Sequence, residues 1–114
     1  MTNDCLFCKI AAGEIPSETV FRSDDVVAFR DINPAAPTHV LVIPVRHVVS
    51  AAGLTAEDGP LLAEIFRTLA SLAEQEGLTG GWRVVTNVGG DAGQSVHHLH
   101  FHLIGGRPMS WPPG

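Results

Sequence analysis

The chain has 114 residues and a formal net charge of −5, with seven Lys and Arg against twelve Asp and Glu. This length supports one domain with a hydrophobic core and not two, so residues 1–114 are expected to form a single domain. The basic residues are dispersed along the chain, which argues against a nucleic-acid groove. The sequence has no long apolar run and no signal-peptide pattern, so a cytoplasmic protein is expected and not a membrane protein.

The two cysteines, Cys5 and Cys8, form a C-x-x-C pair. Such a pair can be a thiol redox motif or half of a zinc site. The redox motif expects a strand before the pair, and the sequence predicts none there. Zinc would need two more ligands, which His39, His47 or the histidines of residues 98–102 could supply. The remaining interpretation is a pair of buried thiols that binds no metal.

A short helix and a hairpin are expected next. Apolar residues fall on one side of a helix over residues 6–12, and Gly13 ends it. Strands over residues 19–22 and 26–31 flank a turn at residues 24–25, which predicts an antiparallel pair.

A central strand is expected over residues 38–44, after a rigid loop at residues 33–37. This run is almost continuously apolar, which is typical of a strand covered on both faces. His39 lies at its start and, taken alone, is most simply an edge residue. His47 follows three residues after Pro44.

One long helix is predicted in the second half of the chain. Apolar residues recur at steps of three and four between residues 61 and 73, Thr55 and Asp58 resemble a capping box, and Gly77 supplies the stop. The apolar band is wide, so the helix could contact a partner as well as its own sheet. The pattern fits equally well with the whole band facing the core.

A strand over residues 82–87 leads into the glycine-rich residues 89–95. Backbone N–H groups of such a loop can converge on an anion such as a phosphate. The loop is not a Walker loop, because it has no Gly-Lys-Ser/Thr and no helix follows it. By itself it could be a plain hairpin connection, and the row of histidines that follows favours the phosphate interpretation.

Residues 98–104 alternate strictly between polar and apolar, which predicts a strand with one buried face. His98, His100 and His102 would line one face, about 7 Å apart. The outer two would be about 13 Å apart, so the three cannot easily bind a single ion. At least one is therefore available for other chemistry, and neutral imidazole is a competent nucleophile near pH 7.

The order of these motifs resembles the histidine-triad (HIT) family. Residues 98–104 are similar to its His-x-His-x-His-x-x motif, and residues 31–39 are similar to its central loop and strand entry. Asn87, residues 93–96 and the tail 111–114 resemble the adenosine-phosphoramidase (Hint-like) branch in particular. The resemblance implies an α+β fold, with an antiparallel sheet of about five strands, one long and one short helix, and a sheet that continues across a homodimer.

The resemblance also implies an activity, the hydrolysis of nucleoside 5′-phosphoramidates at the P–N bond. His100 would attack phosphorus and form a nucleotidyl-histidine intermediate, which water then cleaves. His102 would hold the phosphate oxygens, Ser95 would hydrogen-bond the leaving-group side, and His39 belongs to the same catalytic set. No catalytic metal is implied. His97 precedes the motif where relatives often have an aromatic residue, and no catalytic role is assigned to it.

The implied ligand is a purine nucleoside monophosphate or phosphoramidate of the AMP or GMP type. Asp31 would accept hydrogen bonds from the ribose hydroxyls. The resemblance implies an apolar base pocket formed by Phe7, Ile10, Ile15, Phe29 and Ile32. It implies a phosphate cradle formed by Asn87, Gly93, Gln94 and Ser95. In the tail, it implies that Trp111 takes part in binding.

Two further expectations concern a metal and a partner. A structural zinc is expected on Cys5, Cys8, His47 and His98, since bacterial relatives commonly keep the C-x-x-C with zinc. In the expected homodimer the tail, residues 106–114, reaches toward the partner's active site. Two alternative functions are a dinucleoside polyphosphate hydrolase and a nucleotide-binding regulator or scaffold with little turnover.

Overall fold

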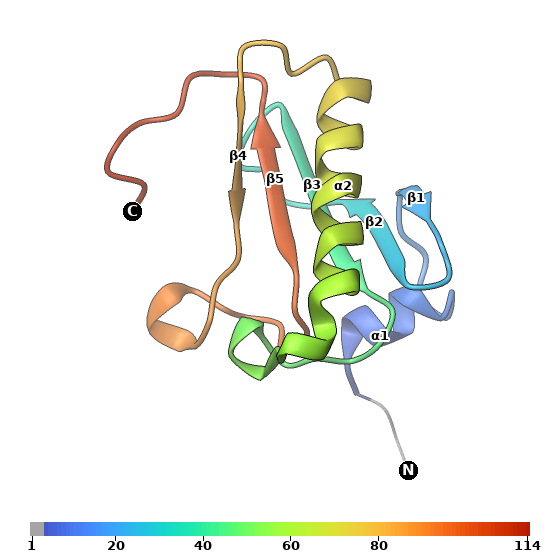
Figure 1. Ribbon diagram of the computed structural model, residues 1–114. Helices are drawn as coiled ribbons and strands as arrows, with labels where there is room; N and C mark the ends of the chain where they lie inside the picture. The colour runs from blue at the N-terminus through green and yellow to red at the C-terminus, as the bar shows by residue number, and fades with distance from the viewer. Residues whose placement is uncertain (1–3) are drawn as a thin grey trace.

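The computed structural model describes residues 4–114 and contains one five-stranded antiparallel sheet (Figure 1). The strand order is β1-β2-β3-β5-β4, and each neighbouring pair is antiparallel. This confirms the predicted α+β fold with one short and one long helix. In chain order the elements are α1 (Leu6–Ala11), β1 (Thr19–Arg22), β2 (Val26–Arg30), β3 (Thr38–Pro44), α2 (Gly59–Gln75), β4 (Trp82–Val85) and β5 (Phe101–Gly105).

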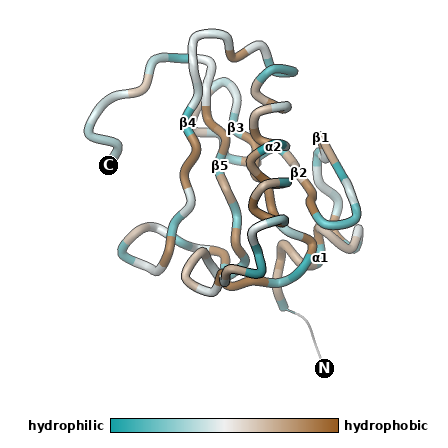
Figure 2. Tube along the Cα trace, viewed as in Figure 1, coloured by the Kyte–Doolittle hydropathy of each residue, from teal (hydrophilic) through white to brown (hydrophobic). Residues whose placement is uncertain are grey.

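The central strand β3 is buried along its whole length, as its apolar run predicts. Val40 and Val42 pack on the face that α2 covers, whereas Leu41 and Ile43 pack on the opposite face with residues of α1. Figure 2 shows the hydrophobic colouring concentrated in the central strands and in α2, while the C-terminal segment is pale. The sheet therefore has a separate core on each side.

The predicted glycines, Gly13 and Gly77, terminate the two helices and lie directly after the C-cap residues Ala12 and Glu76. At Gly13, φ is +79°, and the N–H groups of Gly13 and Glu14 donate to Ile10 and Lys9. This paired bonding is a Schellman motif, which needs the left-handed conformation that glycine adopts at little cost. Gly77 ends α2 in the same way, with φ of +71°.

The start of the long helix differs from the expectation. Thr55 and Asp58 do form a capping box, but it caps a 3₁₀ turn over Ala56–Asp58. The α-helix begins one residue later at Gly59, with Pro60 in its first turn. Proline lacks an N–H group and suits this position, because the first N–H groups of a helix have no partner within it.

At four other boundaries the helix or strand is shorter than predicted. The first helix ends at Ala11 and β2 ends at Arg30, one residue early in each case. Strand β4 stops at Val85, because the Thr86 hydroxyl, not its backbone, bonds the His100 carbonyl oxygen at 2.8 Å. Strand β5 begins only at Phe101, since the chain bends over residues 96–98.

Within residues 4–114, no helix combines the length and the apolar character needed to cross a membrane.

Candidate active site

The histidine row keeps its predicted alternation even where it leaves the sheet. Leu99, Phe101 and Leu103 lie in the core beneath α2. The rings of His98 and His100 lie on the other face, with centroids 6.1 and 5.1 Å from that of Phe7 in α1. The prediction that the histidines share one face is therefore confirmed.

His100 is 7% exposed and is held in one orientation. Its Nδ1 lies 2.6 Å from the backbone carbonyl oxygen of His98. Because a carbonyl oxygen only accepts, the ring proton is on Nδ1, and Nε2 carries an unshared electron pair. The Thr86 hydroxyl fixes the His100 backbone by donating to its carbonyl. In the neutral form of this ring, Nε2 is therefore the nucleophilic nitrogen.

A second chain of contacts sets the tautomer of His102. The Ala35 N–H donates to Nδ1 of His39 at 2.9 Å, so the His39 proton is on Nε2. That nitrogen lies 2.8 Å from Nδ1 of His102 and 3.4 Å from a carboxylate oxygen of Asp31. His39 thus donates to His102, which leaves Nε2–H as the hydrogen-bond donor that His102 can offer.

Burial lowers the pKa of His102 to about 4, and the nearby imidazoles of His100 and His39 act in the same direction. The ring is therefore neutral at pH 7. In the unfolded chain its pKa is about 6.5, so between pH 6.5 and 4 the unfolded state binds more protons than the folded state. This contribution to the free energy of unfolding is complete above pH 6.5 and is lost as the pH falls toward 4.

We therefore expect urea denaturation to give a lower free energy of unfolding at pH 5 than at pH 7. In the His102→Asn variant this pH difference should be smaller, because asparagine can accept the same hydrogen bond and does not titrate. Equal pH differences in the variant and the wild type would contradict the assignment.

A cleft of about 560 Å³ opens beside His100 and His102. Most of the predicted binding residues line it, and Ile32 at its edge is 92% exposed. The predicted residues that line the cleft are Phe7, Ile10, Phe29, Asp31, Ile32, Ser95, His100 and His102. The sequence did not single out Leu6, Leu41 and Val96, which also line it and which give no signal beyond their apolar character.

Five predicted residues do not line this cleft. Ile15 packs against the core around α1, and Asn87 is half-buried next to β4. Gly93 lies in the loop with φ of +97°. The Gln94 side chain is buried, where it accepts from the Gly89 N–H and donates to the carbonyls of Val49 and Val96. Gln94 thus shapes the glycine-rich loop from within.

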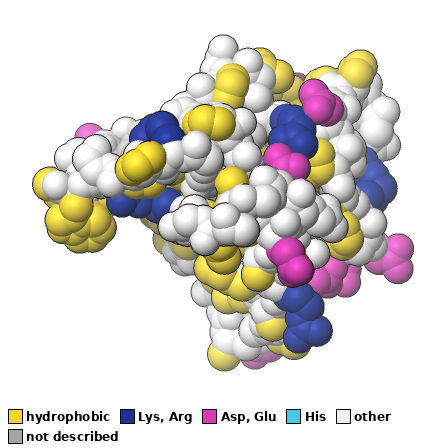
Figure 3. Space-filling view, turned by 90° about the horizontal axis from the view of Figure 1, so that it is seen from above, with side chains coloured by type: hydrophobic (Ala, Val, Ile, Leu, Met, Phe, Trp, Pro, Cys, Tyr) yellow, Lys and Arg dark blue, Asp and Glu magenta, His cyan; other side chains and the backbone are white. Residues whose placement is uncertain are grey.

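The fifth of these residues, Trp111, is 80% exposed on the C-terminal segment. The guanidinium carbon of Arg83 lies 5.9 Å from the centroid of the Trp111 ring. Arg83 also donates to the Ser110 carbonyl at 3.0 Å. Figure 3 shows this segment projecting from the body of the molecule, with hydrophobic and basic side chains along it.

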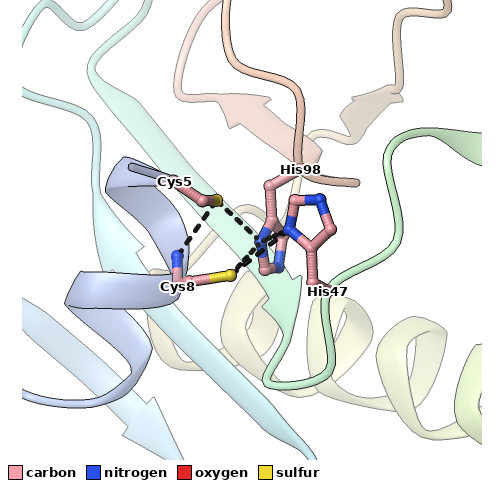
Figure 4. Close-up of side chains that lie close together, drawn as sticks. All are labelled: Cys5, Cys8, His47 and His98. Carbon is pink, nitrogen blue, oxygen red and sulfur yellow. Dashed lines mark hydrogen bonds between the residues drawn. The ribbon is translucent and has the colours of Figure 1, made fainter. Parts of the chain in front are cut away.

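The four predicted zinc ligands come together at the start of α1 (Figure 4). Nδ1 of His98 lies 3.3 Å from the Cys5 sulfur, 3.4 Å from the Cys8 sulfur and 3.2 Å from Nδ1 of His47. All four donor atoms lie within 4.8 Å of one another. The Nε2–H of His98 donates a hydrogen bond to the Pro44 carbonyl oxygen, and burial lowers the pKa of the ring. Nδ1 of His98 is therefore available to a metal.

This cluster fits a tetrahedral metal. Zinc bonds of about 2.0–2.1 Å to nitrogen and about 2.3 Å to sulfur place neighbouring donors roughly 3.3–3.8 Å apart. The sulfur–nitrogen and nitrogen–nitrogen distances of 3.2–3.4 Å are close to that range. The other candidate ligand, His39, belongs to the separate group with Asp31 and His102.

Comparisons with known proteins agree with this geometry. Residues 4–111 match the family model described as "Scavenger mRNA decapping enzyme C-term binding". A HIT family hydrolase from Legionella pneumophila is 51% identical in its solved structure, with a TM-score of 0.96 over 97% of this chain and 100% of that chain. The chain belongs to the histidine-triad family.

Two other HIT relatives match over most of this chain. The adenylylsulfatase HINT1 of Arabidopsis thaliana is 48% identical over 111 residues, which are 96% of this chain and 76% of that protein. A histidine triad nucleotide-binding protein from Candida albicans is 33% identical, with a TM-score of 0.81 over 96% of this chain and 83% of that chain. These matches confirm the HIT family and its Hint-like branch.

Proposed function

We propose that this HIT protein hydrolyses nucleoside 5′-phosphoramidates through a nucleotide covalently bound to His100. The observation that carries the proposal is the fixed tautomer of His100, which places an unshared electron pair on Nε2 of a residue lining the cleft. The similarity to a HIT family hydrolase and to an adenylylsulfatase supports a hydrolase of nucleotides at the level of the family.

The proposed reaction uses the imidazoles of His100 and His102. Nε2 of His100 in its neutral form attacks phosphorus, a proton from water goes to the leaving amine, and the P–N bond breaks. His102 donates its Nε2–H to a phosphate oxygen, where negative charge develops. Ser95 lines the cleft, and we assign to it the hydrogen bond to the leaving group. Water then attacks phosphorus, which releases the nucleoside monophosphate and restores His100.

The strand order supports a proposed direction for the nucleotide across the sheet. His102 lies on β5, Leu41 on the adjacent β3, and Phe29 on β2 beyond it. With the phosphate at β5, the base would lie over Phe29 and Phe7, whose rings are 5.4 Å apart. Asp31, directly after β2, would then accept from the ribose hydroxyls.

A side-by-side turnover assay tests the proposed substrate class. The panel contains adenosine 5′-phosphoramidate, its guanosine counterpart, adenylyl sulfate and diadenosine polyphosphates. We expect the phosphoramidates to have the highest kcat/KM. Faster cleavage of diadenosine polyphosphates would indicate the dinucleoside hydrolase instead. AMP binding without turnover of any substrate would indicate a nucleotide-binding regulator.

We also propose that Cys5, Cys8, His47 and His98 hold a structural zinc. Four protein ligands leave no position for substrate, so the metal would stabilise and not catalyse. His98 links this cluster to the nucleophile, because its ring faces the two sulfurs and its carbonyl accepts the Nδ1 proton of His100. Zinc would thus help to position His100.

A homodimer is the third part of the proposal. Strand β4 is an edge strand, and its first residue, Trp82, is 41% exposed. On α2, Phe66 is also exposed although its ring contacts Phe101. An isologous contact would cover this edge and both aromatic side chains in each subunit. It would also give the projecting tail with Trp111 a partner surface.

Deleting residues 111–114 should change the relative kcat/KM for phosphoramidates with small and large leaving groups. The reason is that a tail docked near the partner's cleft would contact the leaving group and not His100. Light scattering should show a dimer at micromolar concentration. A monomer, or unchanged leaving-group preference after the deletion, would contradict this role for the tail.

A further inference from the structure

The Cys5–Cys8 pair has a geometry that suits thiol oxidation as well as metal binding. Cys5 is the N-cap residue of α1, and the Cys8 N–H donates to its sulfur at 3.3 Å. The two sulfur atoms lie within 4.8 Å of each other, so a rotation of the side chains could bring them to bonding distance. The C-x-x-C spacing at the start of a helix is shared with thiol redox motifs, although within residues 4–114 no strand precedes the pair.

The cluster can be reached from outside. A second cavity, of about 410 Å³, is lined by Cys5, His47 and Asp4, and His97 is exposed on its wall. Cys8 is not among its lining residues. Both cysteines are half-buried, and a small polar molecule such as a peroxide can approach Cys5 through this cavity.

We propose that Cys5 and Cys8 form a peroxide-sensitive disulfide that releases the metal and slows the enzyme. The Cys5 thiolate attacks one oxygen of hydrogen peroxide, the O–O bond breaks, and hydroxide leaves. The Cys8 thiolate then attacks the Cys5 sulfur, the S–O bond breaks, and a second hydroxide leaves. The two thiolates lose two electrons, and the peroxide gains them.

Oxidation would reach the active site through His98. A disulfide removes two of the four donors, and His47 and His98 alone would hold zinc weakly. The His98 ring would then lose its anchor on Nδ1, while its carbonyl is the acceptor that fixes the tautomer of His100. A shift of this carbonyl would disorder the nucleophile. We expect turnover to fall roughly tenfold, as is typical when the support of a site is lost.

The test treats the zinc-loaded protein with hydrogen peroxide and follows three signals. We expect a mass loss of about 2 Da from a Cys5–Cys8 disulfide, the release of one zinc ion to a metallochromic dye, and a parallel fall in turnover. Dithiothreitol with added zinc should restore all three in the wild-type protein. This rescue needs no variant, so it does not depend on whether a variant folds.

The Cys5→Ser variant is the matched control. It should form no disulfide and should keep its own turnover at the same peroxide concentration. Equal inactivation of variant and wild type, formation of sulfinic acid in place of the disulfide, or zinc retained after disulfide formation would overturn the proposal. The inference rests on the proposed zinc and hydrolase, but the mass change reports the disulfide even in a protein that has no turnover.

Discussion

Replacing His100 with alanine should lower kcat by several orders of magnitude while AMP binding is retained. The cleft keeps its apolar walls, with Phe7 and Phe29, and its acceptor, Asp31, so the binding energy of the nucleotide changes little. What is lost is the atom that forms the covalent bond. Steady-state kinetics with adenosine 5′-phosphoramidate and AMP titration by calorimetry measure the two effects separately.

His97→Ala is the matched control for this experiment. His97 is also a histidine of the same segment, but it is exposed and does not line the cleft. Its replacement should leave kcat near the wild-type value. A His100→Ala variant within tenfold of the wild type, or about 1.4 kcal/mol in the activation barrier, would exclude His100 as the nucleophile.

Zinc removal should have the largest effect on stability. The cluster joins α1, the loop after β3 and the segment before β5, which are far apart in the sequence (Figure 4). A ligand that binds only the folded state raises its stability by mass action. We expect strong chelators or the Cys8→Ser substitution to lower Tm by about 10 °C, which corresponds to roughly 2 kcal/mol in a domain of this size.

The zinc experiment contains its own control. If the chelator acts only on this cluster, it should have no further effect on the Tm of the Cys8→Ser variant. Metal analysis of protein purified without chelators should give about one zinc per chain. Protein that contains no zinc, or a chelator that leaves the wild-type Tm unchanged, would refute the structural zinc.

The sequence predicted a strand well where burial of one or both faces imposes a simple pattern of polar and apolar residues. Alternation over residues 98–104 assigns each side chain to a face, because a shift by one residue would bury the histidines in the core under α2. The apolar run of β3 has no polar face, since both sides of that strand are covered. The ends of the strands are set by single contacts, such as the hydrogen bond of the Thr86 hydroxyl. Such contacts leave no periodic pattern in the sequence.

The sequence predicted residues of the candidate site but not the hydrogen bonds that connect them. Residue type alone did not distinguish His39 from His47 as a metal ligand, and the expectation of His47 came with the family resemblance. The antiparallel register of β3 with β5 places the His39 ring against that of His102. His47 lies beyond the end of β3, where the chain brings it to the cysteines. The tautomers depend on these contacts.

The central claim is that the nucleotide becomes bonded to His100, and rapid-quench mass spectrometry tests it most directly. Wild-type protein is mixed with adenosine 5′-phosphoramidate, quenched within milliseconds under conditions that preserve phosphorus–nitrogen bonds, and digested. We predict an adenylyl group on the peptide that contains His100, formed and lost fast enough to account for turnover. Turnover with no adenylylated species, or adenylylation at another residue, would contradict the proposed mechanism.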